Sequence, residues 1–189
     1  VPATIRDVYS ERALSLAGEI SDDLRAEGRK FMQEQIARGT STEETVQQLR
    51  ALFSSWIAEE RAAEAPAGER LTTTARVERI VRTERALAYN TGRNDLMLDP
   101  EVTVIKGVEY SAIRDSRTSE YCAAWDGVVF DVSDRDAINR HGPPAHPNCR
   151  SMLVPVTVFD SGVSITPRTR WPRHDGKVLE PVPGFGGTA

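Results

Sequence analysis

The sequence predicts an α+β fold, in which N-terminal helices are followed by a small, mostly antiparallel sheet and an extended C-terminal tail rich in proline and glycine. Three observations support this. In the first half of the chain, apolar residues recur every three or four positions, as they do on one face of a helix. After about residue 100, the pattern changes to short β-branched runs separated by glycine and proline. These runs are too few and too short for a doubly wound sheet.

Residues 1–60 are predicted to form a helical region with a break at Gly39. A first apolar face is formed by Ile20, Leu24, Phe31 and Ile36. Gly39 stands where a helix would end, and the spacing of Ser41 and Glu44 is that of a capping box. A second helix should therefore start there. It carries one apolar stripe, expected to pack on a neighbouring helix, made of Val46, Leu49, Phe53 and Trp56.

Residues 61–74 are predicted to be a linker or loop, because they contain Pro66 and Gly68 and show no periodicity. An α+β domain is predicted for residues 75–159. Its first element should be a helix that ends near Gly92. The apolar face of this helix would be formed by Val77, Ile80, Val81 and Leu87.

Three β-branched runs follow in the same domain. Residues 102–115 predict one long strand, or two strands interrupted at Gly107. Residues 127–132 predict a short strand, and residues 151–159 predict another, in which Pro155 indicates an edge position. Residues 160–189 are expected to form an extended tail that could order onto a partner.

The composition excludes several classes of protein. The chain has 189 residues, a net charge of −4 and a pI near 5.5, which is not typical of a free-standing nucleic-acid-binding protein. Basic residues within 166–177 could meet phosphates, but the overall charge does not indicate DNA contact. No apolar run approaches the ~18 residues of a membrane span. Two cysteines do not indicate a secreted disulfide scaffold, so a reducing cytosol is favoured.

The clearest chemical signal is a group of potential zinc ligands, Cys122, His141, His146 and Cys149. His146 and Cys149 are spaced as H-x2-C, which lets both side chains approach one ion from a tight turn. Three nearby prolines would stiffen this turn: Pro143, Pro144 and Pro147. His141 is the weakest member, because a solvated loop histidine is its commoner state.

Three other interpretations of these residues stay open. The cysteines could be buried as small apolar side chains, or they could form a disulfide. His146 and Cys149 could also be a catalytic pair, with Asp115 or Asp126 orienting the imidazole. No signature of a known cysteine hydrolase surrounds either cysteine.

Charged residues lie along the predicted third helix, where an ion-paired surface is expected: Arg79, Arg82, Glu84 and Arg85. Arg82 could alternatively reach Asp115 or Arg117. The sequence contains no nucleotide-binding glycine loop, no nucleophile elbow and no HExxH motif.

Three segments in this order resemble a known family: RTERALAYNTGR (82–93), DSRTSEYCAAWDGVVF (115–130) and PPAHPNCRSMLVP (143–155). They are similar to the phage Mu F-like family of minor head, or head morphogenesis, proteins of tailed bacteriophages, and the resemblance covers about residues 35–156. It implies a non-enzymatic virion protein, assembled in the bacterial host cytoplasm and located in the head interior or at the portal vertex. The implied roles are procapsid assembly, portal association, and DNA packaging or delivery. The implied partners are the portal, major capsid or scaffold protein.

The resemblance also marks structural positions, namely Arg82, Thr83, Glu84, Asp115, Arg117, Thr118, Asp126, Gly127 and Arg150. Many family members have further cysteines where this chain has Ser119 and Ser151. A four-cysteine site is therefore excluded, and a three-residue zinc site would remain: Cys122, His146 and Cys149, with His141 or an aspartate as a fourth ligand. Zinc is the one candidate cofactor.

Two rival functions remain. The first is an effector or toxin-type enzyme domain carried by a head protein, whose best candidate residues would be Arg82, Glu84, His146 and Cys149. The second is a small zinc-stabilised interaction module.

Overall fold

A computed structural model of the chain describes residues 22–52, 73–182 and 185–186. It confirms the predicted α+β class, with helices followed by a small antiparallel sheet. The chain divides into two compact units, residues 1–85 and 86–189, which are described separately below. Phe53, Trp56 and residues 61–72 of the predicted linker lie outside the described residues. The domain boundaries expected from the sequence stay predictions.

The first unit contains α2 (Asp22–Arg38), α3 (Thr42–Leu52) and the beginning of α5 (Thr73–Met97). The predicted break is confirmed, because Gly39 has a φ of 68° after α2. The predicted cap of α3 is confirmed as well, since the backbone N–H of Glu44 donates to Ser41 Oγ at 3.1 Å. The buried core of this unit is formed by Met32, Val46, Leu49, Val77, Ile80 and Val81.

The expected end of the third helix at Gly92 is wrong, because α5 continues to Met97. A glycine inside a helix costs about 1 kcal/mol relative to alanine. Continuing the helix buries Met97, and Leu98 directly after it, each to 7% exposure. Burial of such side chains contributes about 1.5–3 kcal/mol apiece, which outweighs the cost of the glycine.

The sheet of the second unit has the order β2-β1-β3 and is antiparallel throughout. Its strands are β1 (Ile105–Ser111), β2 (Val129–Asp131) and β3 (Met152–Thr157). The edge position predicted from Pro155 is confirmed, since β3 pairs with β1 alone in this sheet. Residues 102–115 contribute one strand, whose pairing with β3 is irregular between Ile105 and Gly107. A Cβ on Gly107 would lie 2.7 Å from the Phe130 carbonyl oxygen, so close backbone approach requires glycine here.

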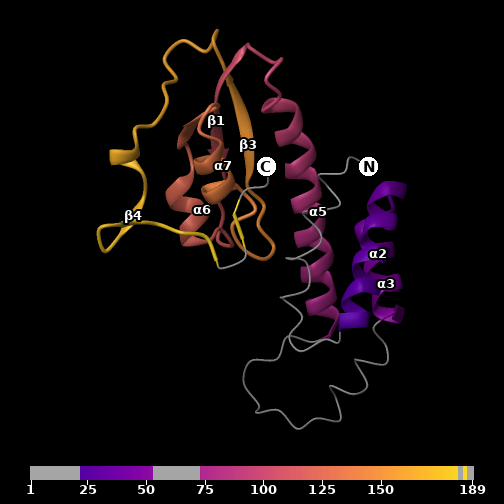
Figure 1. Cartoon of the computed structure of the whole chain (residues 1–189). Helices are drawn as coiled ribbons and strands as arrows, with labels where there is room; N and C mark the ends of the chain where they lie inside the picture. The colour runs from indigo at the N-terminus through magenta and orange to yellow at the C-terminus, as the bar shows by residue number, and fades with distance from the viewer. Residues whose placement is uncertain (1–21, 53–72, 183–184, 187–189) are drawn as a thin grey trace. The chain divides into compact units, whose positions relative to one another are not determined.

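Two short helices were not predicted, α6 (Glu120–Trp125) and α7 (Arg135–His141). They have six and seven residues, which is too short for a clear apolar periodicity. Each begins with a capping side chain, Ser119 for α6 and Asp134 for α7. In Figure 1, β1 and β3 run side by side and α6 and α7 lie against them.

Residues after β3 form a short 3-10 helix, η2 (Arg168–Arg170), and a small hairpin of β4 (Arg173–His174) and β5 (Lys177–Val178). Between η2 and β4, the side chain of Trp171 is buried in the core of the second unit. Part of the segment that the sequence assigns to a tail therefore packs on the domain that precedes it.

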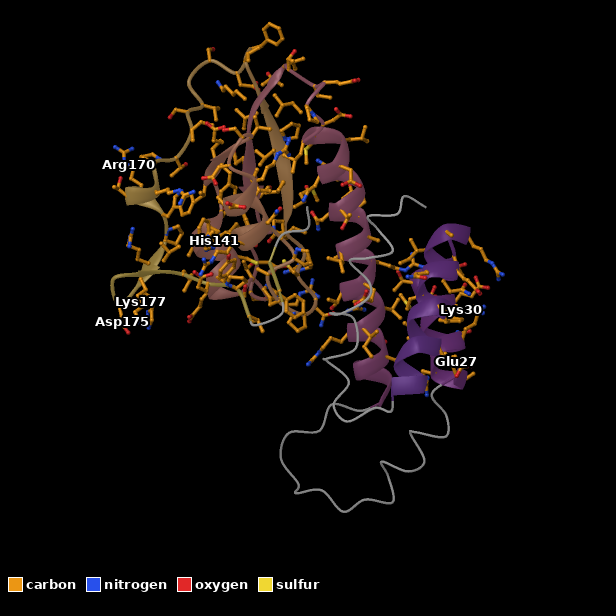
Figure 2. All side chains as sticks on the ribbon, in the orientation of Figure 1. Glu27, Lys30, His141, Arg170, Asp175 and Lys177 are labelled. Carbon is orange, nitrogen blue, oxygen red and sulfur yellow. The ribbon has the colours of Figure 1, made fainter. Side chains whose placement is uncertain are left out.

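The centre of that core is aromatic. The ring of Trp125 stacks on Phe130 at 5.5 Å and on His141 at 4.7 Å between centroids, and Trp171 lies 5.6 Å away. His141 was expected to be solvated, but its exposed fraction is only 4% because these rings surround it. Figure 2 shows His141 inside the unit, with Arg170 and Lys177 at its outer edge. Among the described residues, no helix combines the length and the apolar character needed to cross a membrane.

Candidate functional site

A cluster of two thiols and one imidazole lies in the second unit, formed by Cys122 of α6 and by His146 and Cys149 of the turn before β3. Cys122 Sγ lies 3.1 Å from His146 Nε2 and 3.7 Å from Cys149 Sγ. The three potential ligand atoms lie within 4.8 Å of one another. Both cysteines are free thiols with 3% of their surface exposed, so the disulfide interpretation does not apply to this structure.

Cys122 is held by the first turn of α6. Its backbone N–H donates to the Ser119 hydroxyl, the helix cap, at 3.2 Å. The same hydroxyl oxygen lies 2.9 Å from His146 Nε2, and the buried Tyr110 hydroxyl of β1 lies 3.2 Å from Cys122 Sγ. Neither Ser119 nor Tyr110 was identified as a site residue from the sequence. The alternation of apolar residues along residues 102–115 was the available signal for Tyr110 facing inward.

The other side of the site is the turn around Pro147. His146 Nδ1 lies 2.8 Å from the Pro147 carbonyl oxygen, which fixes Nδ1–H as the donor and directs Nε2 toward Cys122. Asn148 has a φ of 57°, and the Cys149 N–H donates to the His146 carbonyl at 3.1 Å. This reversal of the chain brings His146 and Cys149 to the same side, as their H-x2-C spacing predicted.

The hydrogen bonds of the cluster shift its ionisation. Donation from the Cys149 thiol, and then from His146, holds the pKa of Cys122 well below that of an ordinary thiol. The pKa of His146 is raised, chiefly by its hydrogen bond to Cys122. The pKa of Cys149 is raised instead, because Cys149 donates its hydrogen bond to the neighbouring Cys122 thiolate and because it is buried. Cys122 is therefore the thiol that ionises first, beside a histidine that readily accepts a proton.

Hydrogen bonds and an ion pair hold the segments before and after α6 in position. Before the helix, Asp115 accepts two hydrogen bonds from the Arg150 guanidinium, at 2.6 and 2.7 Å, and this pairing lowers the pKa of the carboxyl. The Asp115 N–H donates to Thr118 Oγ1 at 2.8 Å. After the helix, the Asp126 carboxylate accepts from the Ala112 N–H at 2.8 Å.

Two further residues marked from the sequence, Gly127 and Arg117, take part in the contacts that hold the segments flanking α6. Gly127 has a φ of 82° and donates its N–H to the Tyr110 carbonyl at 2.8 Å. The backbone N–H of Arg117 donates to Asp115 Oδ1 at 2.9 Å, and its guanidinium lies 3.7 Å from the same carboxylate. The marked residues of the second unit thus surround the helix that carries Cys122.

The structure corrects two expectations about these residues and shows a partner of Arg82 on its own helix. His146 is oriented by a backbone carbonyl, whereas Asp115 and Asp126, the two aspartates considered for that role, bind elsewhere. His141 stacks on Trp125 and is not part of the cluster. The Arg82 guanidinium pairs with Glu78 at 3.4 Å, one turn earlier on α5, and a contact of Arg82 with Asp115 or Arg117 stays a prediction.

The remaining motif residues lie in the first unit. Thr83 is buried, and its hydroxyl donates to the Arg79 carbonyl at 2.7 Å. Glu84 is also buried, with 1% of its surface exposed. Arg85 donates to Thr45 Oγ1 at 2.9 Å and to the Thr40 carbonyl, which ties α5 to the start of α3.

Comparison with known proteins gives one match. The model of a family described as "Phage Mu protein F like protein" matches residues 29–154. No curated protein and no solved structure matches the chain.

Proposed function

The chain belongs to the family of phage Mu protein F like proteins, and from that premise we propose that it is a minor head protein of a tailed phage or phage-like particle. The observation that carries this proposal is the extent of the match, which covers residues 29–154 and so includes parts of both compact units. The role we propose is assembly of the procapsid at the portal vertex, with the portal protein as the first partner and the major capsid or scaffold protein as further ones.

A structural role is supported by what the marked residues do. Asp115, Thr118 and Arg150 hold the loop before α6, and Asp126 and Gly127 hold the turn after it. Each of these five residues forms a hydrogen bond with another residue of the second unit. Such a network fixes a loop in one geometry, which suits a surface that must fit a neighbouring protein.

The proposal is tested in the phage or prophage that encodes the chain. A stop codon early in the gene is complemented from a plasmid, and particles are purified and analysed by mass spectrometry. We expect the complementing protein to be recovered with procapsids or virions, and the titre to fall sharply without it. Absence of the protein from both kinds of particle would refute the proposal.

The portal location is tested by chemical cross-linking of purified procapsids. We expect cross-links between this chain and the portal protein. Cross-links confined to the major capsid protein would contradict the portal location while leaving a role in the head intact.

A matched pair of arginine variants tests whether recovery of the protein in particles depends on the ordered loop before α6 or only on the charge of the surface. Arg150→Gln removes the bidentate partner of Asp115, whereas Arg170→Gln changes an exposed arginine of η2. We expect the first variant to reduce recovery in particles and the second to leave recovery unchanged. Equal recovery of both would show that the loop before α6 is not needed for assembly.

A second candidate function rests on one observation, the 3.1 Å contact between Cys122 Sγ and His146 Nε2. An effector enzyme could use this thiol as a nucleophile and the imidazole as its base. Cys122 replaces Cys149 as the candidate nucleophile, because it is the thiol with the lowered pKa. Only 3% of its surface is exposed, so a substrate could reach the sulfur only after the residues around it rearrange.

The enzyme alternative predicts that expression of the chain harms a bacterial host and that Cys122→Ser or His146→Gln abolishes the harm. Normal growth of a host that expresses the wild-type chain at a high level, verified by immunoblot, would argue against this alternative.

A further inference from the structure

We propose that Cys122, His146 and Cys149 bind one zinc ion, with the fourth coordination position open beside the Ser119 hydroxyl. This inference does not depend on the proposed role in the phage head. It rests on the distances between the three side chains, the orientation of the histidine and the burial of the two thiols.

The distances fit a tetrahedral ion. Zinc binds thiolate sulfur at about 2.3 Å and imidazole nitrogen at about 2.0 Å, which places two sulfurs about 3.8 Å apart and sulfur and nitrogen about 3.5 Å apart. The sulfurs of Cys122 and Cys149 are 3.7 Å apart, and Cys122 Sγ is 3.1 Å from His146 Nε2. The three ligand atoms lie within 4.8 Å of one another, so side-chain rotations are enough to place them around one ion.

The histidine is oriented as a ligand. Metal-binding histidines usually donate their second ring N–H to a carbonyl or carboxylate, which fixes the tautomer and the ring plane. His146 has this arrangement, with Nδ1 2.8 Å from the Pro147 carbonyl oxygen and Nε2 directed at the thiols. The turn that carries the ring is itself held, because the Val182 N–H donates to the Ala145 carbonyl at 3.0 Å.

A zinc ion would also neutralise the charge of the two buried thiolates. Two thiols that are each 3% exposed lie in contact, and ionising both without compensation is unfavourable in a buried place. A divalent cation neutralises two thiolates and leaves no net charge at the site.

The fourth position follows from the place of Ser119. Its hydroxyl oxygen lies 2.9 Å from His146 Nε2 and caps the helix that carries Cys122. Zinc sites with three protein ligands keep a water in the fourth position. A water bound there would lie beside this hydroxyl, and a thiol at position 119 would take its place.

Binding would join two parts of the second unit. Cys122 and Cys149 are 27 residues apart, one in α6 and the other in the turn before β3. An ion that holds both to His146 would stabilise this turn, and removal of the ion would loosen it.

The first experiment measures zinc in the full chain after purification without chelator. Elemental analysis should find about one zinc per chain. Cys122→Ser and His146→Gln should each lower the content at least about tenfold. The control is His174→Gln, which changes a histidine with 80% side-chain exposure and should not lower the zinc content.

Three outcomes would overturn the proposal. One is a zinc content of wild-type chain below about half an equivalent that does not rise on adding zinc. Another is equal zinc in wild type and in both ligand variants. The third is an intact mass that is lower by two hydrogens, because a disulfide would then occupy both sulfurs.

The second experiment remains informative if the ligand variants fail to fold. Ser119→Cys adds a fourth ligand, so competition with a coloured chelator should show zinc affinity at least about tenfold higher than for wild type. The wild-type melting temperature should fall in EDTA and recover with zinc but not with magnesium. An unchanged affinity would refute the open position, and a melting temperature that is insensitive to zinc would refute the site. Because both readouts use the isolated protein, they are independent of whether the chain is found in particles.

Discussion

The substitution Trp171→Ala tests whether the segment after β3 belongs to the folded unit. Trp171 follows η2, in the part of the chain that the sequence assigns to a tail. Its ring lies 5.6 Å from Trp125, 5.8 Å from Phe130 and 5.5 Å from His141, between centroids. Its indole N–H donates to the Thr166 carbonyl at 3.1 Å. Removing the side chain opens a cavity among aromatic rings and leaves that carbonyl without its donor.

The size of the effect follows from burial. An aromatic side chain of this kind buries about 150–250 Å², and only 8% of Trp171 stays exposed. At about 25 cal/mol per Å², the lost burial corresponds to roughly 4–6 kcal/mol. Alanine retains the Cβ and the site partly collapses, so we expect the free energy of unfolding to fall by about 3–5 kcal/mol. For a unit of this size, that lowers the melting temperature by roughly 15 °C or more.

The assay is urea denaturation followed by far-UV circular dichroism, because tryptophan fluorescence would change with the substitution itself. Phe159→Ala is the matched control, since it removes an aromatic ring that also follows β3 but is 81% exposed. We expect the control to change stability by less than about 0.5 kcal/mol. If Trp171→Ala were equally mild, the segment after β3 would not be part of the cooperative fold and the packing argument would fail.

Three further predictions concern single positions. Gly107→Ala should destabilise the chain by about 1–3 kcal/mol in urea denaturation, because the new Cβ would lie 2.7 Å from the Phe130 carbonyl oxygen; a change below about 0.5 kcal/mol would contradict this. Asp115→Asn should lower the melting temperature at low ionic strength, and the difference should shrink in high salt as the lost ion pair with Arg150 is screened; a salt-independent difference would count against the ion pair. Burial lowers the pKa of His141, so the unfolded chain takes up this proton more readily than the folded one. Stability should therefore begin to fall as the pH drops below about 6.5, and the fall should be complete below the folded pKa. His141→Phe should be less sensitive to acid than wild type in melts between neutral and acidic pH, and an identical pH profile would contradict this assignment.

Local patterns in the sequence were sufficient for the fold class and several elements. The break at Gly39, the cap at Ser41 and the edge strand with Pro155 depend on neighbours a few residues away or on a missing backbone donor, and all three are confirmed. Local rules failed at Gly92, because the helix continues when its last turn and Leu98 can be buried against residues far along the chain. They also missed α6 and α7, which are too short to show a period.

The sequence by itself determined the residue types of the candidate site, the H-x2-C spacing of His146 and Cys149, and the order of motifs that indicates the family. Only the tertiary structure decided which of the candidate groups meet. Cys122 joins that pair through α6, whereas His141, five residues before His146, turns away to stack on Trp125. The physical reason is that ligand distances depend on contacts such as Asp115 with Arg150 and Tyr110 with Cys122, which join residues that are separated in the chain. The spacing of residues in the sequence determines which side chains can come together within one turn. For residues that are further apart in the chain, only the packing of the folded unit determines which side chains are in contact.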